Sequence, residues 1–181
     1  MPAPSALSNG LTLFQAVPSG SSVKSPAGPL YIDCANGIGF LAAQEFAKRL
    51  AGTLEIKTVN TGHEGGILNK DCGADFVKTQ QRLPHSMTPH LHPGQRACSL
   101  DGDADRLIYY YLDGKGAFHM LDGDKIAALV AGFLKELVTG AGLQNKLKGG
   151  IGVVQTAYAN GASTDYLKQV GTNPIFLPLF D

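Results

Sequence analysis

An acidic stretch, Asp101-Gly-Asp-Ala-Asp-Arg106, constrains the fold of this chain more than any other feature. Its three carboxylates alternate with glycine and alanine, and an apolar, β-prone run from Leu107 to Leu112 follows directly. This pattern predicts a strand, a tight acidic loop and a second strand over residues 98–112. Carboxylates this close repel one another unless a cation compensates. We therefore expect Asp101, Asp103 and Asp105 to hold a hard divalent ion, most simply Mg²⁺.

Other acidic motifs fit this spacing less well. A solvated Asp-Gly turn is the simplest alternative, but the apolar flanks place these carboxylates at strand ends rather than in a long polar loop. An EF-hand beginning at Asp101 needs Gly at its sixth position and Glu at its twelfth, where this chain has Arg106 and Leu112. A phosphatase of the Asp-x-Asp nucleophile type usually has Thr, Ser or Val after the second Asp, whereas Asp105 and Arg106 follow here.

Short β-prone runs alternate with amphipathic segments along the chain, which predicts an α/β fold: a mixed sheet with flanking helices, followed by part of a second α/β domain. Asp122 and Ser163 are the expected N-caps of the last two helices, and capping explains Asp122 and Asp124 better than a second metal pair does. Besides the strands around the acidic loop, we expect strands over 30–34, 54–59, 117–121 and 151–155, and helices over 40–50, 122–138 and 164–170. An apolar stripe marks the second helix: Ile126, Leu129, Val130, Phe133, Leu134 and Leu137.

A long stretch from residue 60 to 93 is rich in Gly, Pro, Ser and Thr and contains four of the five histidines. No zinc-type spacing relates these histidines, so we expect a solvated loop. Within it, residues 73–82 are expected to form a structured turn. Lys78 and Arg82 there either face a phosphate or form a solvated pair.

Composition narrows the class of protein. The formal net charge is +0, which argues against nucleic acid and anionic membranes as partners. The longest apolar run, 126–134, is too short to span a bilayer. Three cysteines without paired spacing predict reduced, mostly buried thiols in a cytoplasmic protein.

The acidic loop resembles the metal loop of the α-D-phosphohexomutases, and the chain most resembles their phosphoacetylglucosamine mutase branch. The narrower resemblance runs over about residues 30–170 and is carried by four further stretches: 33–39, 72–78, 122–127 and 153–161. It implies a Mg²⁺-dependent isomerase that interconverts N-acetylglucosamine 6-phosphate and 1-phosphate in UDP-N-acetylglucosamine biosynthesis, so that the partner is a small-molecule sugar phosphate. It further implies that Asp101, Asp103 and Asp105 hold the Mg²⁺ and that Arg106 stabilises the phosphate.

Residues 1–28 are rich in Ser, Pro, Gly and Ala and are expected to form a linker or a remnant of a preceding domain. The resemblance divides the rest of the chain into a metal-binding, domain 2-like unit (29–118) and a partial domain 3-like segment (119–181). The family's phosphoserine loop, sugar-binding loop and distal phosphate loop have no counterpart in the sequence, and the tail after Val170 departs from the family pattern. We therefore expect a fragment that is inactive in isolation. Two other functions stay open: a non-catalytic metal-binding module and a Mg²⁺-dependent phosphatase.

Overall fold

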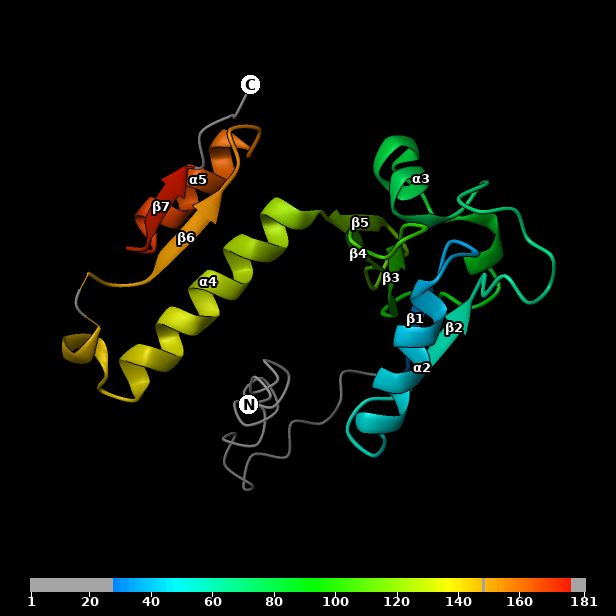
Figure 1. Ribbon diagram of the computed structural model, residues 1–181, viewed down its shortest axis with the longest axis horizontal. Coiled ribbons are helices and arrows are strands. Elements are labelled where there is room, and N and C mark those ends of the chain that lie inside the picture. The colour runs from blue at the N-terminus through cyan, green and yellow to red at the C-terminus, as the bar shows by residue number, and fades with distance from the viewer. Residues whose placement is uncertain (1–27, 148, 177–181) are drawn as a thin grey trace, which may run out of the picture.

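A five-stranded mixed sheet forms the larger part of the protein in this computed structural model, which describes residues 28–147 and 149–176. The strand order is β2-β1-β3-β4-β5 (Figure 1). β1 runs parallel to both β2 and β3, whereas β4 runs antiparallel to β3 and β5. The strands are β1 (Leu30–Asp33), β2 (Ile56–Val59), β3 (Arg96–Leu100), β4 (Leu107–Leu112) and β5 (Phe118–Leu121). The predicted mixed sheet with flanking helices is thus confirmed.

Each face of the sheet has its own apolar core. Neighbouring residues of β3, Ala97 and Cys98, enter opposite cores because side chains alternate across a strand. Helix α2 (Gly39–Arg49) contributes Ala43 to the core on one face, together with Ile32, Cys34 and Cys98. Helix α3 (Gly73–Gln80) contributes to the core on the other, which comprises Ala74, Val77, Met87, Leu91, Ala97, Ile108 and Tyr110. The two helices therefore pack on opposite faces of the sheet whose strands β3 and β4 carry the acidic loop.

The prediction of a solvated loop over residues 60–93 is wrong in its second half. That stretch contains α3 and a 3-10 turn, η1 (His85–Met87), and it buries Val77 and Met87 completely. An eight-residue helix is too short to be stable alone, so tertiary packing rather than a visible periodicity creates it.

The second unit begins with the long helix α4 (Gly123–Gly140). It continues through the 3-10 turn η2 (Gln144–Lys146), β6 (Gly152–Gln155), α5 (Gly161–Gln169) and β7 (Asn173–Phe176), and β6 pairs with β7 in parallel. Asp122 caps α4 as predicted, since its Oδ1 accepts a hydrogen bond from the Lys125 amide at 3.2 Å.

The predicted cap at Ser163 is wrong. Asn160 Oδ1 accepts from the Ala162 amide at 2.9 Å, so α5 begins earlier, and Ser163 lies buried inside the helix. After Val170 the chain forms β7, which pairs with β6.

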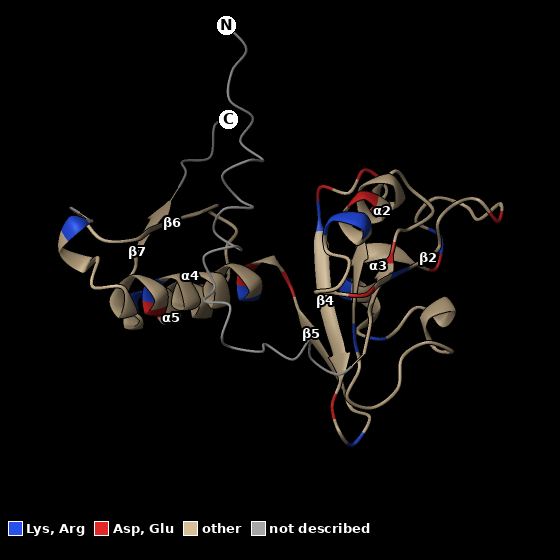
Figure 2. Ribbon diagram, turned by 90° about the horizontal axis from the view of Figure 1, so that it is seen from below, with Lys and Arg blue, Asp and Glu red and all other residues tan. Residues whose placement is uncertain are grey.

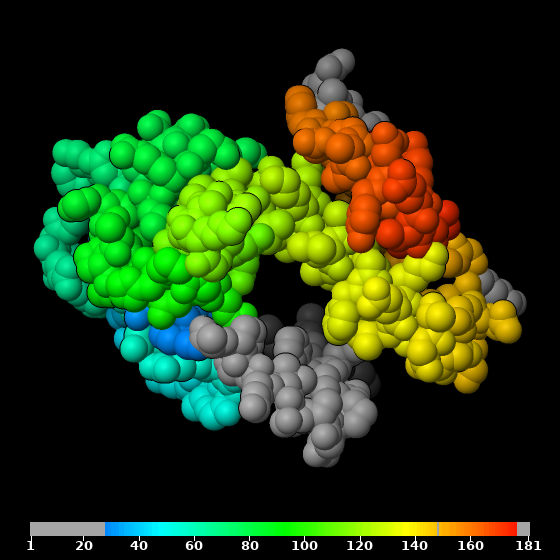
Figure 3. All heavy atoms as spheres, turned by 180° about the vertical axis from the view of Figure 1, so that it is seen from behind, coloured from blue at the N-terminus to red at the C-terminus, as the bar shows by residue number. Residues whose placement is uncertain are grey.

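The apolar stripe on α4 is not the face that this helix buries. Among the described residues, α4 packs through Ala128 and Ala131 against Leu167 of α5. Leu129 and Phe133 of the stripe remain 54% and 59% exposed. Figure 3 shows α4, in yellow-green to yellow, at the molecular surface.

Lysine and arginine positions are interspersed with aspartate and glutamate positions over the described elements, in keeping with the neutral net charge (Figure 2). No helix in the described ranges is long and apolar enough to cross a membrane. The domain division after residue 118 stays a prediction; it falls within β5, which pairs with β4. The segment 1–27 lies outside the described residues.

Candidate metal centre

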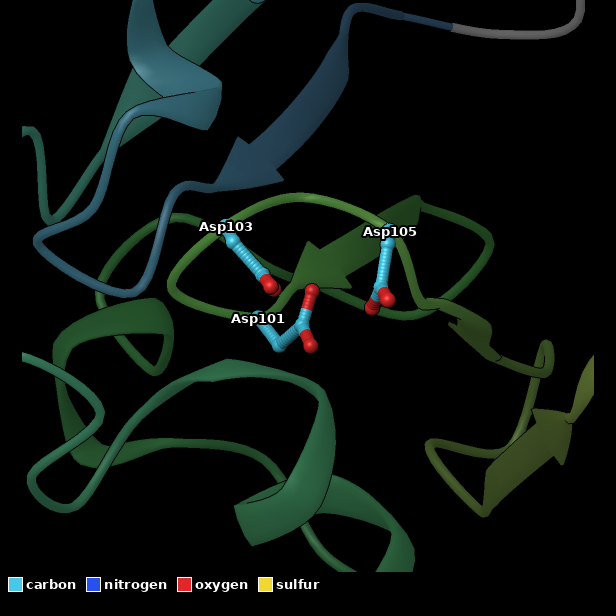
Figure 4. Close-up of side chains that lie close together, drawn as sticks. All are labelled: Asp101, Asp103 and Asp105. Carbon is cyan, nitrogen blue, oxygen red and sulfur yellow. The ribbon is translucent and has the colours of Figure 1, made fainter.

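The acidic loop joins two adjacent antiparallel strands, β3 and β4, and turns back within six residues. Ala104 adopts a left-handed backbone (φ +62°) and its amide donates to the Asp101 carbonyl oxygen at 3.1 Å, which tightens the turn. As a result, Asp101, Asp103 and Asp105 each place a carboxylate oxygen within 4.8 Å of the others (Figure 4). The structure thus brings together all three residues that the sequence singled out.

The donor set suits magnesium. Mg²⁺ prefers oxygen ligands at about 2.1 Å in octahedral geometry, so opposite ligands lie about 4.2 Å apart. Neighbouring ligands of such an octahedron lie about 3.0 Å apart, so the three carboxylate oxygens, which lie within 4.8 Å of one another, would draw closer to share one ion. Asp103 and Asp105 are exposed, which leaves room for water or a phosphate oxygen at the remaining positions.

Electrostatics across the loop also favour a cation. Burial opposes ionisation of Asp101, but hydrogen bonds from Arg106 outweigh it and lower the pKa of this carboxyl. Repulsion from Asp103, and then the proximity of Asp101, raise the pKa of Asp105. A divalent ion among the three carboxylates would relieve this repulsion.

Arg106 connects the loop to α3. Its Nε donates to Asp101 Oδ2 at 2.8 Å, and its backbone amide donates to Asp101 Oδ1 at 3.1 Å. Its two terminal nitrogens donate to the two oxygens of Asp75, at 2.5 and 2.9 Å. The hydrogen bonds to Asp101 and Asp75 raise the pKa of Arg106, so the guanidinium is a permanent cation at the edge of the centre.

The turn between β1 and α2 contacts the acidic loop directly. The Ile38 amide donates to the Gly102 carbonyl oxygen at 3.0 Å. A Cβ atom on Gly37 would lie 2.2 Å from that same oxygen, so only glycine permits this approach. The turn that leads into α2 and the metal loop are therefore fitted together.

Lys78 and Arg82 occupy different surroundings. Lys78 lines a cavity of about 290 Å³ beside the acidic loop, together with Asp75, Asp105 and Arg106. Arg82 instead lies over the Phe76 ring, 5.4 Å from its centre. Only Lys78 is thus placed to meet an anionic group at the centre.

Sequence reasoning missed two residues of this site. Asp75 and Gly37 both lie in stretches that carry the family resemblance, yet neither received a role. Asp75 precedes Arg106 by 31 positions, so the spacing gives no sign that the two side chains meet.

Comparison with known families points in one direction. Residues 20–108 match the family model of phosphoacetylglucosamine mutase AMG1, domain II, and residues 122–177 match that of domain III. The match through residue 177 overturns the expectation that the tail departs from the family after Val170.

Curated relatives agree with these models. Phosphoacetylglucosamine mutase from Mus musculus is 50% identical over 145 residues, which cover 80% of this chain and 26% of the relative. The Homo sapiens protein of the same name is 48% identical over 162 residues, covering 90% of this chain and 28% of the relative. The chain therefore spans little more than a quarter of the length of these relatives.

Solved structures show the same relationship. Aspergillus fumigatus N-acetylphosphoglucosamine mutase, in complex with GlcNAc-6P and magnesium, superposes with a TM-score of 0.72 at 48% identity, covering 82% of this chain and 28% of the other. A substrate complex of N-acetylglucosamine-phosphate mutase, described as a member of the α-D-phosphohexomutase superfamily, superposes at 0.73 with 40% identity, covering 83% and 28%.

Proposed function

Because this chain belongs to the phosphoacetylglucosamine mutase family, we propose that it provides the magnesium-binding part of an enzyme that interconverts N-acetylglucosamine 6-phosphate and N-acetylglucosamine 1-phosphate. One observation carries the proposal: Asp101, Asp103 and Asp105 converge within 4.8 Å on a loop that also carries Arg106. The relative whose complex contains magnesium and GlcNAc-6P superposes over 82% of this chain.

The three aspartates would hold the ion in this proposal. Bound there, Mg²⁺ would supply positive charge against the negative charge of the transferring phosphoryl group. Arg106 keeps Asp101 oriented through two hydrogen bonds and still has N–H groups left over for a phosphate oxygen. Lys78 lines the adjacent cavity together with Arg106 and would add a second cation for a phosphate there.

The family's phosphoryl donor is a phosphoserine in a Thr-Ala-Ser-His-Asn-Pro-like loop, which this sequence does not contain. The proposal is therefore best tested in a protein that supplies the donor. We would replace the segment of the Mus musculus relative that matches this chain, over 145 residues, with the corresponding residues of this chain. The chimera is expected to interconvert the two sugar phosphates in a Mg²⁺-dependent manner.

The matched control is the same chimera carrying Asp103→Asn, which should fold and lose turnover. A folded wild-type chimera without activity would contradict the proposal. Hydrolysis of simple phosphoesters by the chimera, abolished by Asp103→Asn and unaccompanied by mutase turnover, would favour the phosphatase alternative instead.

A further inference from the structure

We propose that Asp75 is a positioning residue of the metal centre: it fixes the guanidinium of Arg106, which in turn holds the carboxylate of Asp101 in place for the ion. This inference rests on the metal-binding role proposed above. Asp75 lies outside the acidic loop, on α3, and its contacts with the loop run through Arg106.

The contact between Asp75 and Arg106 is two-pronged. Arg106 Nη1 donates to Asp75 Oδ1 at 2.5 Å and Nη2 donates to Oδ2 at 2.9 Å. This fork-on-fork geometry defines the plane of the guanidinium, which a single hydrogen bond would leave free to rotate. The third nitrogen of the same plane, Nε, then meets Asp101 Oδ2 at 2.8 Å.

Donor counting shows how the guanidinium is divided between its neighbours. An arginine side chain has five N–H groups. Three of them are used: Nε toward Asp101 and one on each terminal nitrogen toward Asp75. One N–H remains on each terminal nitrogen, and because Asp75 fixes the plane, the direction of these two donors is fixed as well.

Asp75 is itself held in place by the start of α3. The Gly73 amide donates to the buried Asp33 Oδ2 at 2.7 Å, and Gly73 has φ +83°. A Cβ atom at this position would lie 3.0 Å from the carbonyl oxygen of Leu100, the residue immediately before Asp101. The helix that carries Asp75 and the strand that leads into the loop are thus in direct contact at their ends.

The exposure of the pair argues for orientation rather than stability. Both side chains are 58% exposed, and exposed ion pairs contribute at most about 1 kcal/mol to folding. Without Asp75, however, the cationic Arg106 is left with the acidic loop alone, where Asp105 Oδ1 already lies 3.7 Å from its Nε. Arg106 would then compete with the metal ion for the same oxygens.

The test is metal binding by the 181-residue chain, measured by titration calorimetry with Mn²⁺ and Mg²⁺. Asp75→Asn keeps the shape of the side chain but removes the charge that pairs with Arg106. We expect metal binding to weaken about tenfold, as loss of a residue that orients a ligand commonly does. Asp75→Glu, which retains the carboxylate, should recover most of the affinity.

The matched control is Asp71→Asn. It removes the same charge from the segment just before α3, at a residue with φ +56°, a conformation that asparagine accepts readily. This variant should bind metal within about twofold of wild type, because charge at an exposed position is screened. Equal losses in Asp71→Asn and Asp75→Asn would mean that only net charge matters and would overturn the proposal.

A second readout needs no metal. The Nε–H of Arg106 should give a protected NMR signal in the metal-free wild type and in Asp71→Asn, and should lose this protection in Asp75→Asn at an unchanged thermal midpoint. Wild-type metal affinity in Asp75→Asn would overturn the positioning role and leave the proposed function standing. A folded wild type that binds neither ion would reject both.

Discussion

Ser99 Oγ donates a hydrogen bond to Asp33 Oδ2 at 2.7 Å, between two side chains that are both fully buried in the centre of the sheet. Because the single Ser99 proton is used in this way, Tyr110 must donate to Ser99 Oγ, 3.0 Å away. Burial raises the pKa of Tyr110, which keeps its proton available. The three side chains form one directed chain that ends on the carboxyl group of Asp33.

The Asp33 carboxyl group also binds three of the segments that surround the metal centre. Its oxygens also accept from the Ala35 amide, from Asn60 Nδ2 and from the Gly73 amide, at 3.0, 2.7 and 2.7 Å. These donors come from the turns after β1 and β2 and from the start of α3. Through its bond to the Gly73 amide, Asp33 therefore fixes the start of α3, the helix that carries Asp75, next to the acidic loop.

Asp33→Asn should strongly destabilise the fold. All four partners of Asp33 are donors, so an amide NH₂ would face a donor wherever it points. We expect a loss of about 2–4 kcal/mol in the free energy of unfolding, measured with urea. Asp165→Asn, an exposed site on α5, is the control and should stay within about 0.5 kcal/mol of wild type. Similar stability of the two variants would contradict the role of Asp33.

Asp103→Asn should reduce metal affinity while leaving the fold intact. Asp103 is exposed, so the substitution costs little packing, but it removes one of three converging carboxylates. Calorimetric titration with Mn²⁺ or Mg²⁺ should show a loss of at least about tenfold. Binding at wild-type strength would remove Asp103 from the ligand set.

Gly37→Ala should disturb the metal loop through the backbone. The added Cβ would lie 2.2 Å from the Gly102 carbonyl oxygen, so one of the two loops must move. We expect a loss of about 1–3 kcal/mol in unfolding free energy together with weaker metal binding. Gly161→Ala, where nothing lies within 4 Å, is the control. Unchanged stability and metal affinity in Gly37→Ala would show that the two loops are not closely fitted.

The three cysteine thiols should be nearly inert in the folded protein. Burial, followed by repulsion from Asp33, raises the pKa of Cys34 to about 12 and that of Cys72 to about 11. Burial also raises the pKa of Cys98 to about 12. At pH 8 thiol reagents should react at least about 100-fold more slowly than in urea, because the thiolate fraction is that much smaller. Cys72 should react first, and Cys72→Ser should abolish the first phase.

The same shifts predict a loss of stability at alkaline pH. The folded pKa values lie above the ordinary value of 9.0, so the folded state keeps its thiol protons when the unfolded state has lost them. Stability from this source is complete below about pH 9 and falls as the pH rises through the folded pKa values of about 11 to 12. Urea unfolding at pH 8 and pH 10 should show the decrease, and Cys98→Ala should reduce it.

The 181-residue chain alone should not interconvert the two N-acetylglucosamine phosphates, even with Mg²⁺ and a bisphosphate activator. The acidic loop and Arg106 offer charge stabilisation, but no serine of the sequence lies in a donor-like loop. Positioning of donor and acceptor supplies much of the rate in phosphoryl transfer. A coupled assay at high protein concentration is the measurement. Turnover that disappears in Asp103→Asn would contradict this prediction.

Local sequence was enough to predict the acidic loop and much of the sheet. Asp101, Asp103 and Asp105 lie within five consecutive positions between two strands, so a short loop brings their oxygens together whatever the rest of the chain does. Alternation within β4 and the cap at Asp122 are equally local, since neighbouring residues decide them.

What only the tertiary structure decided depends on contacts between residues that are distant in sequence. The pairing of Asp75 with Arg106 spans 31 positions, and the bond from Gly73 to Asp33 spans 40. The existence of α3 depends on its packing against the sheet, and the face that α4 buries depends on α5. A sequence pattern records the periodicity of a single element, but it does not record which other element packs against it. The sequence alone therefore identified the three metal-binding candidates, whereas the residues that hold them in place could be identified only from the folded structure.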